Sequence, residues 1–207
     1  KRFTYEEAEE SIKKFGAPLH KELAILNNLA KLLTAERFRN GAISLEQEEV
    51  KFVLDPKGVP LKVITKERGD SNRLIEEFML LANKKVAEVL SPPKKDNKNQ
   101  KWNEGVSIYR VHDLPSREKM EDLAYFLRSL GHKISLINGI IPNHEINKLL
   151  KGLSGKDSKS TTSDTVHRAV IRSMAKAIYS TENIGHYGLA FEHYTHFTSP
   201  IRRYPDI

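Results

Sequence analysis

The C-terminal segment, residues 185–206, carries the side chains best suited to binding a polyanion. Arg202 and Arg203 are adjacent, and a guanidinium is a planar fork of donors that matches the oxygens of a phosphate. Aromatic faces, on which unpaired nucleic-acid bases stack, occur in the same segment. The rings and their polar neighbours are Phe191, Tyr194, Phe197, Tyr204, His193, His196, Thr198 and Ser199. The segment is therefore predicted to bind a polyanionic strand.

The composition agrees with an anionic partner. The 207 residues include 34 Lys and Arg against 27 Asp and Glu, which gives a net charge of +7. Nucleic acid is the commonest partner of such a charge, although charge alone leaves open a merely basic protein with no such partner. The length suits one large domain or two small ones, each with its own core.

The absence of cysteine excludes a disulfide framework, a Cys-rich zinc site and a thiol nucleophile. No apolar run approaches the roughly 18 residues that span a bilayer, so we expect a cytoplasmic protein without a membrane partner. The chain begins with Lys1 and ends one residue after Asp206. We therefore expect it to be a piece of a longer protein.

The spacing of apolar residues and capping signals predicts a helix-rich chain. Thr4 and Glu7 form a capping box that starts a helix ending at Gly16. Ser71 and Ser116 are predicted N-caps of later helices. The remaining predicted helices span residues 19–39, with Leu23, Leu26, Leu29, Leu32 and Leu33 on one face, 72–90, 117–130 and 165–179.

Fewer segments are typical of strands. Residues 49–54 and 60–66 flank Asp55-Pro-Lys-Gly58, good turn chemistry, and are predicted to form a hairpin. Residues 107–112 alternate like a strand, and 94–101 and 151–163 are predicted flexible loops. This order of elements predicts an α+β fold in which long helices pack around a small sheet or hairpin.

The motif His196-Phe-Thr-Ser-Pro-Ile-Arg-Arg-Tyr-Pro-Asp206 resembles the signature of the ribonuclease II and ribonuclease R family, whose RNB catalytic domain defines a group of 3′-to-5′ exoribonucleases. The resemblance is nearest to the ribonuclease R branch and covers essentially the whole chain. Further segments match in the family's order, namely 40–44, 49–52, 74–83, 109–113 with Pro115, 172–179 and 185–189.

This resemblance implies a function for the parent protein. We expect a processive, hydrolytic exoribonuclease that threads single-stranded RNA into a channel, releases nucleoside 5′-monophosphates and works as a monomer with Mg²⁺. The family holds its magnesium through aspartates that lie upstream of the segments matched here. Residues 1–207 are thus expected to be an incomplete RNB domain that is inactive alone, with metal ligands before residue 1. The acidic groups 46–49, 76–77 and 121–122 are interpreted as structural or solvated charges.

The resemblance also implies roles for individual residues. Arg202 is expected at the scissile phosphate, where a guanidinium would offset charge in the transition state, and Tyr5 is expected to orient the same phosphate. Phe52 is expected to stack on bases, unless it is an ordinary core residue of its strand. The remaining RNA-binding candidates are Arg203, Tyr204, Glu77 and Glu76, the glutamates through ribose hydroxyls. His112, His186 and His196 are interpreted as hydrogen-bonded structural residues.

Two functions of other classes remain open. A non-catalytic single-stranded RNA-binding module would bind RNA without cleaving it, and its affinity for RNA would fall steeply as the salt concentration rises. A helical interaction scaffold with a basic surface would show no such RNA affinity.

Overall fold

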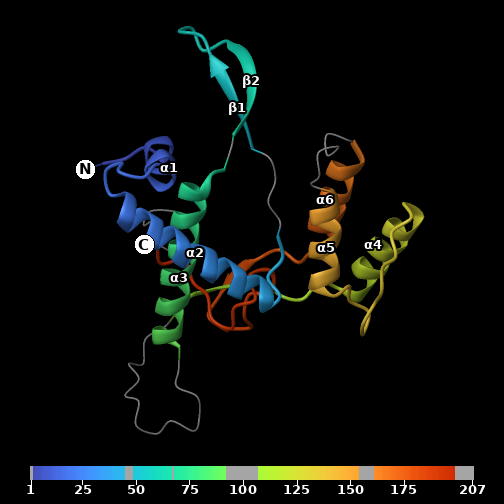
Figure 1. Cartoon of the computed structure of the whole chain (residues 1–207). Coiled ribbons are helices and arrows are strands. Elements are labelled where there is room, and N and C mark those ends of the chain that lie inside the picture. Colours follow the sequence, from blue (N-terminus) through green and yellow to red (C-terminus); the bar gives the residue numbers. More distant parts are fainter. Residues whose placement is uncertain (1, 45–48, 67, 92–106, 154–160, 199–207) are drawn as a thin grey trace, which may run out of the picture. The chain divides into compact units, whose positions relative to one another are not determined.

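The computed structural model describes residues 2–44, 49–66, 68–91, 107–153 and 161–198 (Figure 1). The predicted helix-rich α+β class is confirmed. The helices are α1 (Tyr5–Lys13), α2 (His20–Arg39), α3 (Asp70–Leu90), α4 (Arg117–Ser129), α5 (Asn143–Leu153), α6 (Thr161–Ser173) and the 3-10 helix η1 (Tyr187–Leu189). The strands β1 (Glu49–Leu54) and β2 (Pro60–Lys66) form one antiparallel sheet, and β3 (Tyr109–Val111) and β4 (Ile178–Ser180) form another.

The chain divides into two compact units. Unit 1 consists of residues 1–35 and 45–78, and unit 2 consists of residues 36–44 and 79–207. Helices α2 and α3 therefore contribute residues to both. None of the helices in the described ranges is long and apolar enough to cross a membrane.

In unit 1, α1 begins as predicted. The Thr4 hydroxyl accepts a hydrogen bond from the Glu7 amide at 3.2 Å, and the Thr4 amide donates to the Glu7 carboxylate at 2.8 Å. This reciprocal pair satisfies two of the amide groups that a helix start leaves without partners. The predicted helix between Thr4 and Gly16 is thus confirmed, and it ends at Lys13.

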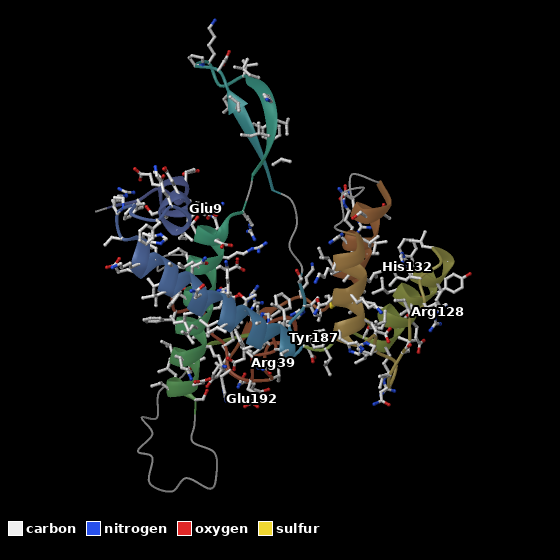
Figure 2. All side chains as sticks on the ribbon, viewed as in Figure 1. Glu9, Arg39, Arg128, His132, Tyr187 and Glu192 are labelled. Atoms are coloured by element: carbon white, nitrogen blue, oxygen red, sulfur yellow. The ribbon has the colours of Figure 1, made fainter. Side chains whose placement is uncertain are left out.

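Helix α3 begins differently from the prediction. It starts at Asp70, so Ser71 lies within its first turn and the prediction of Ser71 as N-cap is wrong. The Glu9 carboxylate of α1 accepts the Ser71 amide at 2.8 Å, and the Ser71 hydroxyl donates to the Tyr5 carbonyl at 3.0 Å. Glu9 projects toward this turn (Figure 2). A carboxylate from another helix thus replaces the local cap and joins α1 to α3.

Helix α2 is confirmed, but its leucine face is not the buried face. Leu32 is 68% exposed, whereas Asn27 and Ala30 are buried. The Asn27 amide donates to the Asp70 carboxylate at 3.0 Å, and the Lys31 ammonium lies 2.6 Å from the same carboxylate. These polar contacts to the start of α3 select the face of α2 that packs within unit 1.

The predicted hairpin of β1 and β2 is confirmed at both ends of both strands. Phe52 pairs with Val63, and the register shifts between Val53 and Leu54. In the turn, the Asp55 carboxylate accepts the amides of Lys57 and Val59 at 2.8 Å each. Gly58 has φ +83°, a left-handed conformation that glycine adopts without strain.

The core of unit 2 lies among α4, α5 and α6, which run beside one another (Figure 1). Ser116 caps α4 as predicted, accepting the Lys119 amide. Most of the largest completely buried apolar side chains come from these helices and their flanks, namely Met120, Leu127, Ile141, Ile146, Val166 and Val170, while Val111 of β3 packs with Ala87 and Tyr109. Helical spacing places Met120, Leu127, Ile146 and Val170 on inward faces.

Three predictions in this unit need correction. Residues 143–153 form helix α5, which the sequence did not indicate, so residues 151–153 end a helix and are not part of a loop. Residues 161–163 begin α6, and the remainder of the predicted loop, like the loop 94–101, lies outside the described residues. Helix α6 ends at Ser173, and residues 178–180 form β4 instead, because they pair with β3. The strand predicted over 107–112 is confirmed over 109–111.

Two asparagines of α5 bind the segment that follows α2. The Asn147 amide donates to the Ala42 carbonyl at 2.8 Å and accepts the Ser44 amide at 2.9 Å. Asn143 donates to the Gly41 carbonyl at 2.6 Å and accepts from the Tyr187 hydroxyl. Tyr187, labelled in Figure 2, thereby joins η1 to α5. These bonds bring parts of the chain about a hundred residues apart into one packed unit.

Candidate nucleic-acid site

The structure places four of the predicted site residues in unit 1. Tyr5 opens α1 and is 51% exposed, while its carbonyl is held by Ser71. Phe52 is 52% exposed on the hairpin, so the interpretation of Phe52 as a core residue is wrong and its ring is accessible for stacking. Arg202, Arg203 and Tyr204 lie outside the described residues.

The two glutamates of α3 have opposite environments. Glu76 is exposed, whereas Glu77 is 5% exposed. Adjacent residues on a helix point about 100° apart, which explains the difference. A carboxylate is rarely buried without a polar partner, and Glu77 has polar interactions in this structure.

In unit 2, the buried side chain of Asn83 binds the segment that leads into the arginine motif. Asn83 lies on α3 and is 2% exposed. Its amide oxygen accepts the backbone amides of Phe197 at 2.9 Å and Thr198 at 2.8 Å, and the Thr198 hydroxyl at 3.0 Å. Its amide nitrogen donates to the Tyr194 hydroxyl at 3.2 Å. We call residues 194–198 the anchored segment.

Further bonds hold the anchored segment along its length. The Tyr194 carbonyl accepts the Arg110 amide at 2.9 Å, and the Thr195 hydroxyl donates to the Ile108 carbonyl at 2.6 Å. His196 Nδ1 lies 2.7 Å from the Tyr179 hydroxyl. The segment is therefore attached to α3 on one side and to β3 and β4 on the other.

Aromatic rings surround Tyr194, which is itself buried. His186 and His196 meet its ring edge-on, with centroids at 5.3 and 5.8 Å, and Phe191 lies tilted at 5.8 Å. Such edge-to-face contacts favour one relative orientation of the rings. Phe191 and Tyr194 thus pack against each other and hold the anchored segment in place. The prediction that aromatic rings of this segment stack on bases is therefore left to Phe197 and Tyr204.

The histidines are structural, as predicted. His112 Nε2 binds the Ala175 carbonyl at 2.9 Å and its Nδ1 accepts the Gly188 amide at 3.1 Å, which is the neutral tautomer. Burial lowers the pKa of His112, and burial together with the nearby His112 lowers the pKa of His186 to about 3. A Cβ at Gly188 would lie 2.9 Å from His112 Nδ1, so glycine permits this close approach.

The described residues do not fit a magnesium site. Within the described ranges, no three Asp, Glu, His or Cys side chains lie close enough together to hold a metal ion. Near the start of α3, the Glu9 and Asp70 carboxylates are engaged by Lys13, Ser71, Lys31 and Asn27. Hard Mg²⁺ requires several converging oxygen ligands, so these acids are structural.

Asn83 was missed by the sequence-based reasoning. An asparagine within the apolar repeat of a helix is a signal, because a buried amide requires partners for its donor and acceptor groups. The sequence did not show that those partners are 111 to 115 residues away.

Comparison with known proteins agrees with this arrangement. The model of the RNB domain family matches residues 1–207. Ribonuclease R of Aquifex aeolicus is 35% identical over 213 residues, which cover 100% of this chain and 28% of the relative. Ribonuclease R of Escherichia coli is 35% identical over 202 residues, 97% of this chain and 23% of the relative.

A solved structure is similar throughout. Mycoplasma genitalium RNase R in complex with ribose-methylated single-stranded RNA superposes with a TM-score of 0.79 at 27% identity, covering 99% of this chain and 31% of that one. The chain therefore spans between about a quarter and a third of the length of these relatives. The family resemblance inferred from the motifs is confirmed, and the chain belongs to the RNB domain family.

Proposed function

We propose that this chain is part of an exoribonuclease that degrades single-stranded RNA from its 3′ end by hydrolysis, processively and with release of nucleoside 5′-monophosphates. The observation that carries the proposal is the family match over all 207 residues, with ribonuclease R relatives at 35% identity. The charge of +7 and the adjacent Arg202 and Arg203 supply the phosphate-binding chemistry that this substrate requires.

In this proposal the residues of the chain have distinct roles. The Arg202 guanidinium binds the scissile phosphate and offsets the charge that gathers on its oxygens in the transition state. The exposed Tyr5 phenol donates to the same phosphate, and the exposed Phe52 ring stacks on a base. Arg203 and Tyr204 contact the strand, and the exposed Glu76 accepts from ribose hydroxyls, which favours RNA over DNA, whereas Glu77 is buried in this structure and is not accessible to the strand.

The proposal also covers the cofactor, the oligomeric state and the localisation of the full-length protein. Mg²⁺ is expected to supply Lewis-acid chemistry in the full-length protein, through ligands other than the described residues. The full-length protein is proposed to act as a cytoplasmic monomer on single-stranded RNA, and residues 1–207 alone to lack activity.

The test compares the full-length protein, its Arg202→Ala variant and residues 1–207 on a single-stranded RNA that carries its label on the internal phosphates. We expect mononucleotide release by the full-length protein, and a loss of about 100-fold or more in single-turnover rate for Arg202→Ala with RNA affinity within about threefold. Arg168→Ala, which removes an exposed arginine of α6, is the matched control and should leave both unchanged.

The competing functions give other results. Salt-dependent RNA binding by the full-length protein without any cleavage would establish the binding module in place of the enzyme. Neither binding nor cleavage would favour the scaffold. Equal losses of affinity and rate in Arg202→Ala would limit Arg202 to substrate binding, and mononucleotide release by residues 1–207 would show that their own residues complete the active site.

A further inference from the structure

A pocket of about 530 Å³ lies between the turn that follows α4 and helix α5. This volume is in the range of sites that take small-molecule ligands. The turn contributes His132 and Lys133 to the lining, and α5 contributes His144, Glu145 and Lys148. The pocket lies wholly within unit 2, and none of its lining residues has a role in the proposed function.

The turn after α4 is held in place by α4 itself. The amides of Gly131 and His132 donate to carbonyls in the last turn of α4 at 2.9 and 3.1 Å, and Gly131 has a φ of +87°, which is a common way for a glycine to end a helix. The Arg128 guanidinium donates twice to the Ile134 carbonyl, at 3.1 and 2.8 Å. Arg128 and His132 are labelled in Figure 2. This wall of the pocket is therefore formed before any ligand binds, which lowers the entropic cost of binding.

The lining is rich in basic side chains. Within the described residues, no hydrogen bond or ion pair is formed by four of them, namely His132, Lys133, His144 and Lys148. The carboxylate of the lining belongs to Glu145, and it already accepts the Ser135 amide at 3.0 Å, which joins the turn to α5. Two ammonium groups and two imidazoles thus line the pocket together with one hydrogen-bonded carboxylate. A cleft with an excess of positive charge attracts an anion.

The remaining lining residues suit a base better than a bare ion. Leu149 and Leu153 of α5 are half-buried, and Ile134 is 8% exposed. Together with the flat imidazole rings they provide a surface against which a heterocyclic base can pack. A lysine ammonium binds a phosphate as a point charge, and an imidazole N–H donates to its oxygens. A nucleotide carries both a phosphate and a base, so it matches both parts of the lining.

We propose that this pocket, which we call the α4–α5 pocket, is a nucleotide-binding site. Lys133 and Lys148 neutralise the phosphate, and the base packs against the imidazoles and the side chains of Leu149 and Leu153. The site does not depend on the proposed RNA cleavage, because the two involve different residues. The recognition chemistry is the same for a free nucleoside 5′-monophosphate and for a nucleotide unit of an RNA strand, and the experiment separates these two sources.

The experiment measures the hydrogen exchange of residues 131–153 in the full-length protein, with adenosine 5′-monophosphate, adenosine or inorganic phosphate as the probe. Adenosine 5′-monophosphate at about ten times its dissociation constant should slow exchange in this region about tenfold, because the ligand stabilises the folded pocket. Adenosine lacks the phosphate and inorganic phosphate lacks the base. At the same concentration, each of them should slow exchange less than about twofold.

Replacing both lysines tests the site directly. The double variant Lys133→Gln and Lys148→Gln should weaken the binding of adenosine 5′-monophosphate about 30-fold, because two charge-assisted contacts are lost. The matched control is Lys151→Gln, since Lys151 is also an exposed lysine of α5 but does not line the pocket. Its affinity should stay within about twofold of the unchanged protein. All three lysines are exposed, so these variants should fold normally.

A single-stranded RNA with phosphorothioate linkages, which resist cleavage, distinguishes the two sources. Protection of residues 131–153 by adenosine 5′-monophosphate identifies a site for a free nucleotide. Protection by the RNA alone, lost in the double variant, identifies a site for a nucleotide of the strand. Protection by neither probe, protection that the double variant retains, or equal protection by inorganic phosphate would overturn the proposal. RNA cleavage is measured separately, so a failure of the proposed function would leave this result unchanged.

Discussion

Each of the two units of this chain is stabilised internally by a different kind of contact. In unit 1, charged groups at the start of α3 join the helices: Glu9 with Ser71 and Lys13, and Asp70 with Asn27 and Lys31. Within its described residues, only Ala30 and Leu74 are buried hydrophobic residues. In unit 2, neutral side chains bind backbone groups inside a larger core, as Asn83, Asn147 and His112 do.

This difference shows how each unit should respond to its surroundings. Partly exposed ion pairs contribute little to the free energy of unfolding and are screened by salt. The contacts of Glu9 and Asp70 that connect the helices of unit 1 should therefore depend on pH and ionic strength. Neutral hydrogen bonds in a buried interior are insensitive to salt but costly to leave unsatisfied. The contacts of unit 2 are therefore the less sensitive to salt, and unit 2 is the unit that holds the anchored segment.

The largest expected effect tests where the core lies. Leu127 of α4 is 0% exposed, and Leu127→Ala should lower the free energy of unfolding by about 3 kcal/mol, because it removes buried methyl groups and leaves a cavity. Leu32→Ala, the same change at a 68% exposed position of α2, should cost less than about 0.5 kcal/mol. Denaturant unfolding of the full-length protein measures both. Equal costs would contradict the division into a packed and a poorly packed unit.

The next effect concerns pH. Because burial lowers the pKa of His186 from 6.5 to about 3 in the folded state, the unfolded chain binds a proton that the folded chain does not. Stability of unit 2 is then full above about pH 6.5 and falls as the pH drops toward 3. His186→Asn keeps an acceptor for the Leu189 amide and should flatten the decline in unfolding temperature between pH 6.5 and 4.5. The exposed His144, replaced by Asn, is the control; an undiminished slope in His186→Asn would show that other groups cause it.

The stability of unit 1 should begin to fall at a lower pH than that of unit 2. Burial alone would raise the pKa of Glu9, but hydrogen bonds from Lys13, Ser71 and Asp70 lower it below 4.5, and Lys31 and Asn27 lower the pKa of Asp70 below 3.8. Their contribution is present above these unfolded values and is lost as the pH falls through the folded ones. Glu9→Gln should weaken the start of α3 by about 1 kcal/mol, seen as faster hydrogen exchange there at neutral pH. Glu10→Gln, whose pairing with Lys14 is exposed, should change nothing.

The smallest effects compare two glycines with open space around them. A Cβ at Gly58 or Gly152 meets no atom within 4 Å, so only backbone conformation matters. Gly58→Ala should destabilise the hairpin by about 1 kcal/mol because its φ of +83° disfavours a side chain. Gly152→Ala should stabilise α5 by up to about 0.5 kcal/mol, because alanine favours the helix. Hydrogen exchange of the two regions measures both, and effects of the same sign would contradict this explanation.

Local signals predicted the elements whose stabilising contacts are themselves local. The hairpin was predicted to the residue because Asp55 and Gly58 build its turn within five positions, and the start of α1 was predicted because its capping box spans Thr4 to Glu7. Local signals did not predict three other features, because distant segments determine them. Glu9 determines the start of α3, the segment 41–44 binds α5, and pairing with β3 ends the helical stretch before residues 178–180.

The candidate site divides in the same way. Residue types indicated that Arg202 and Arg203 could bind phosphate, and motif spacing indicated the resemblance to the RNB family, which in turn implied the roles of Arg202, Tyr5 and Phe52. Only the tertiary structure showed Phe52 exposed, Glu77 buried beside an exposed Glu76, and Asn83 bound to the chain before the arginines. Burial and long-range hydrogen bonds depend on which distant segments pack together, and a linear pattern does not contain that information.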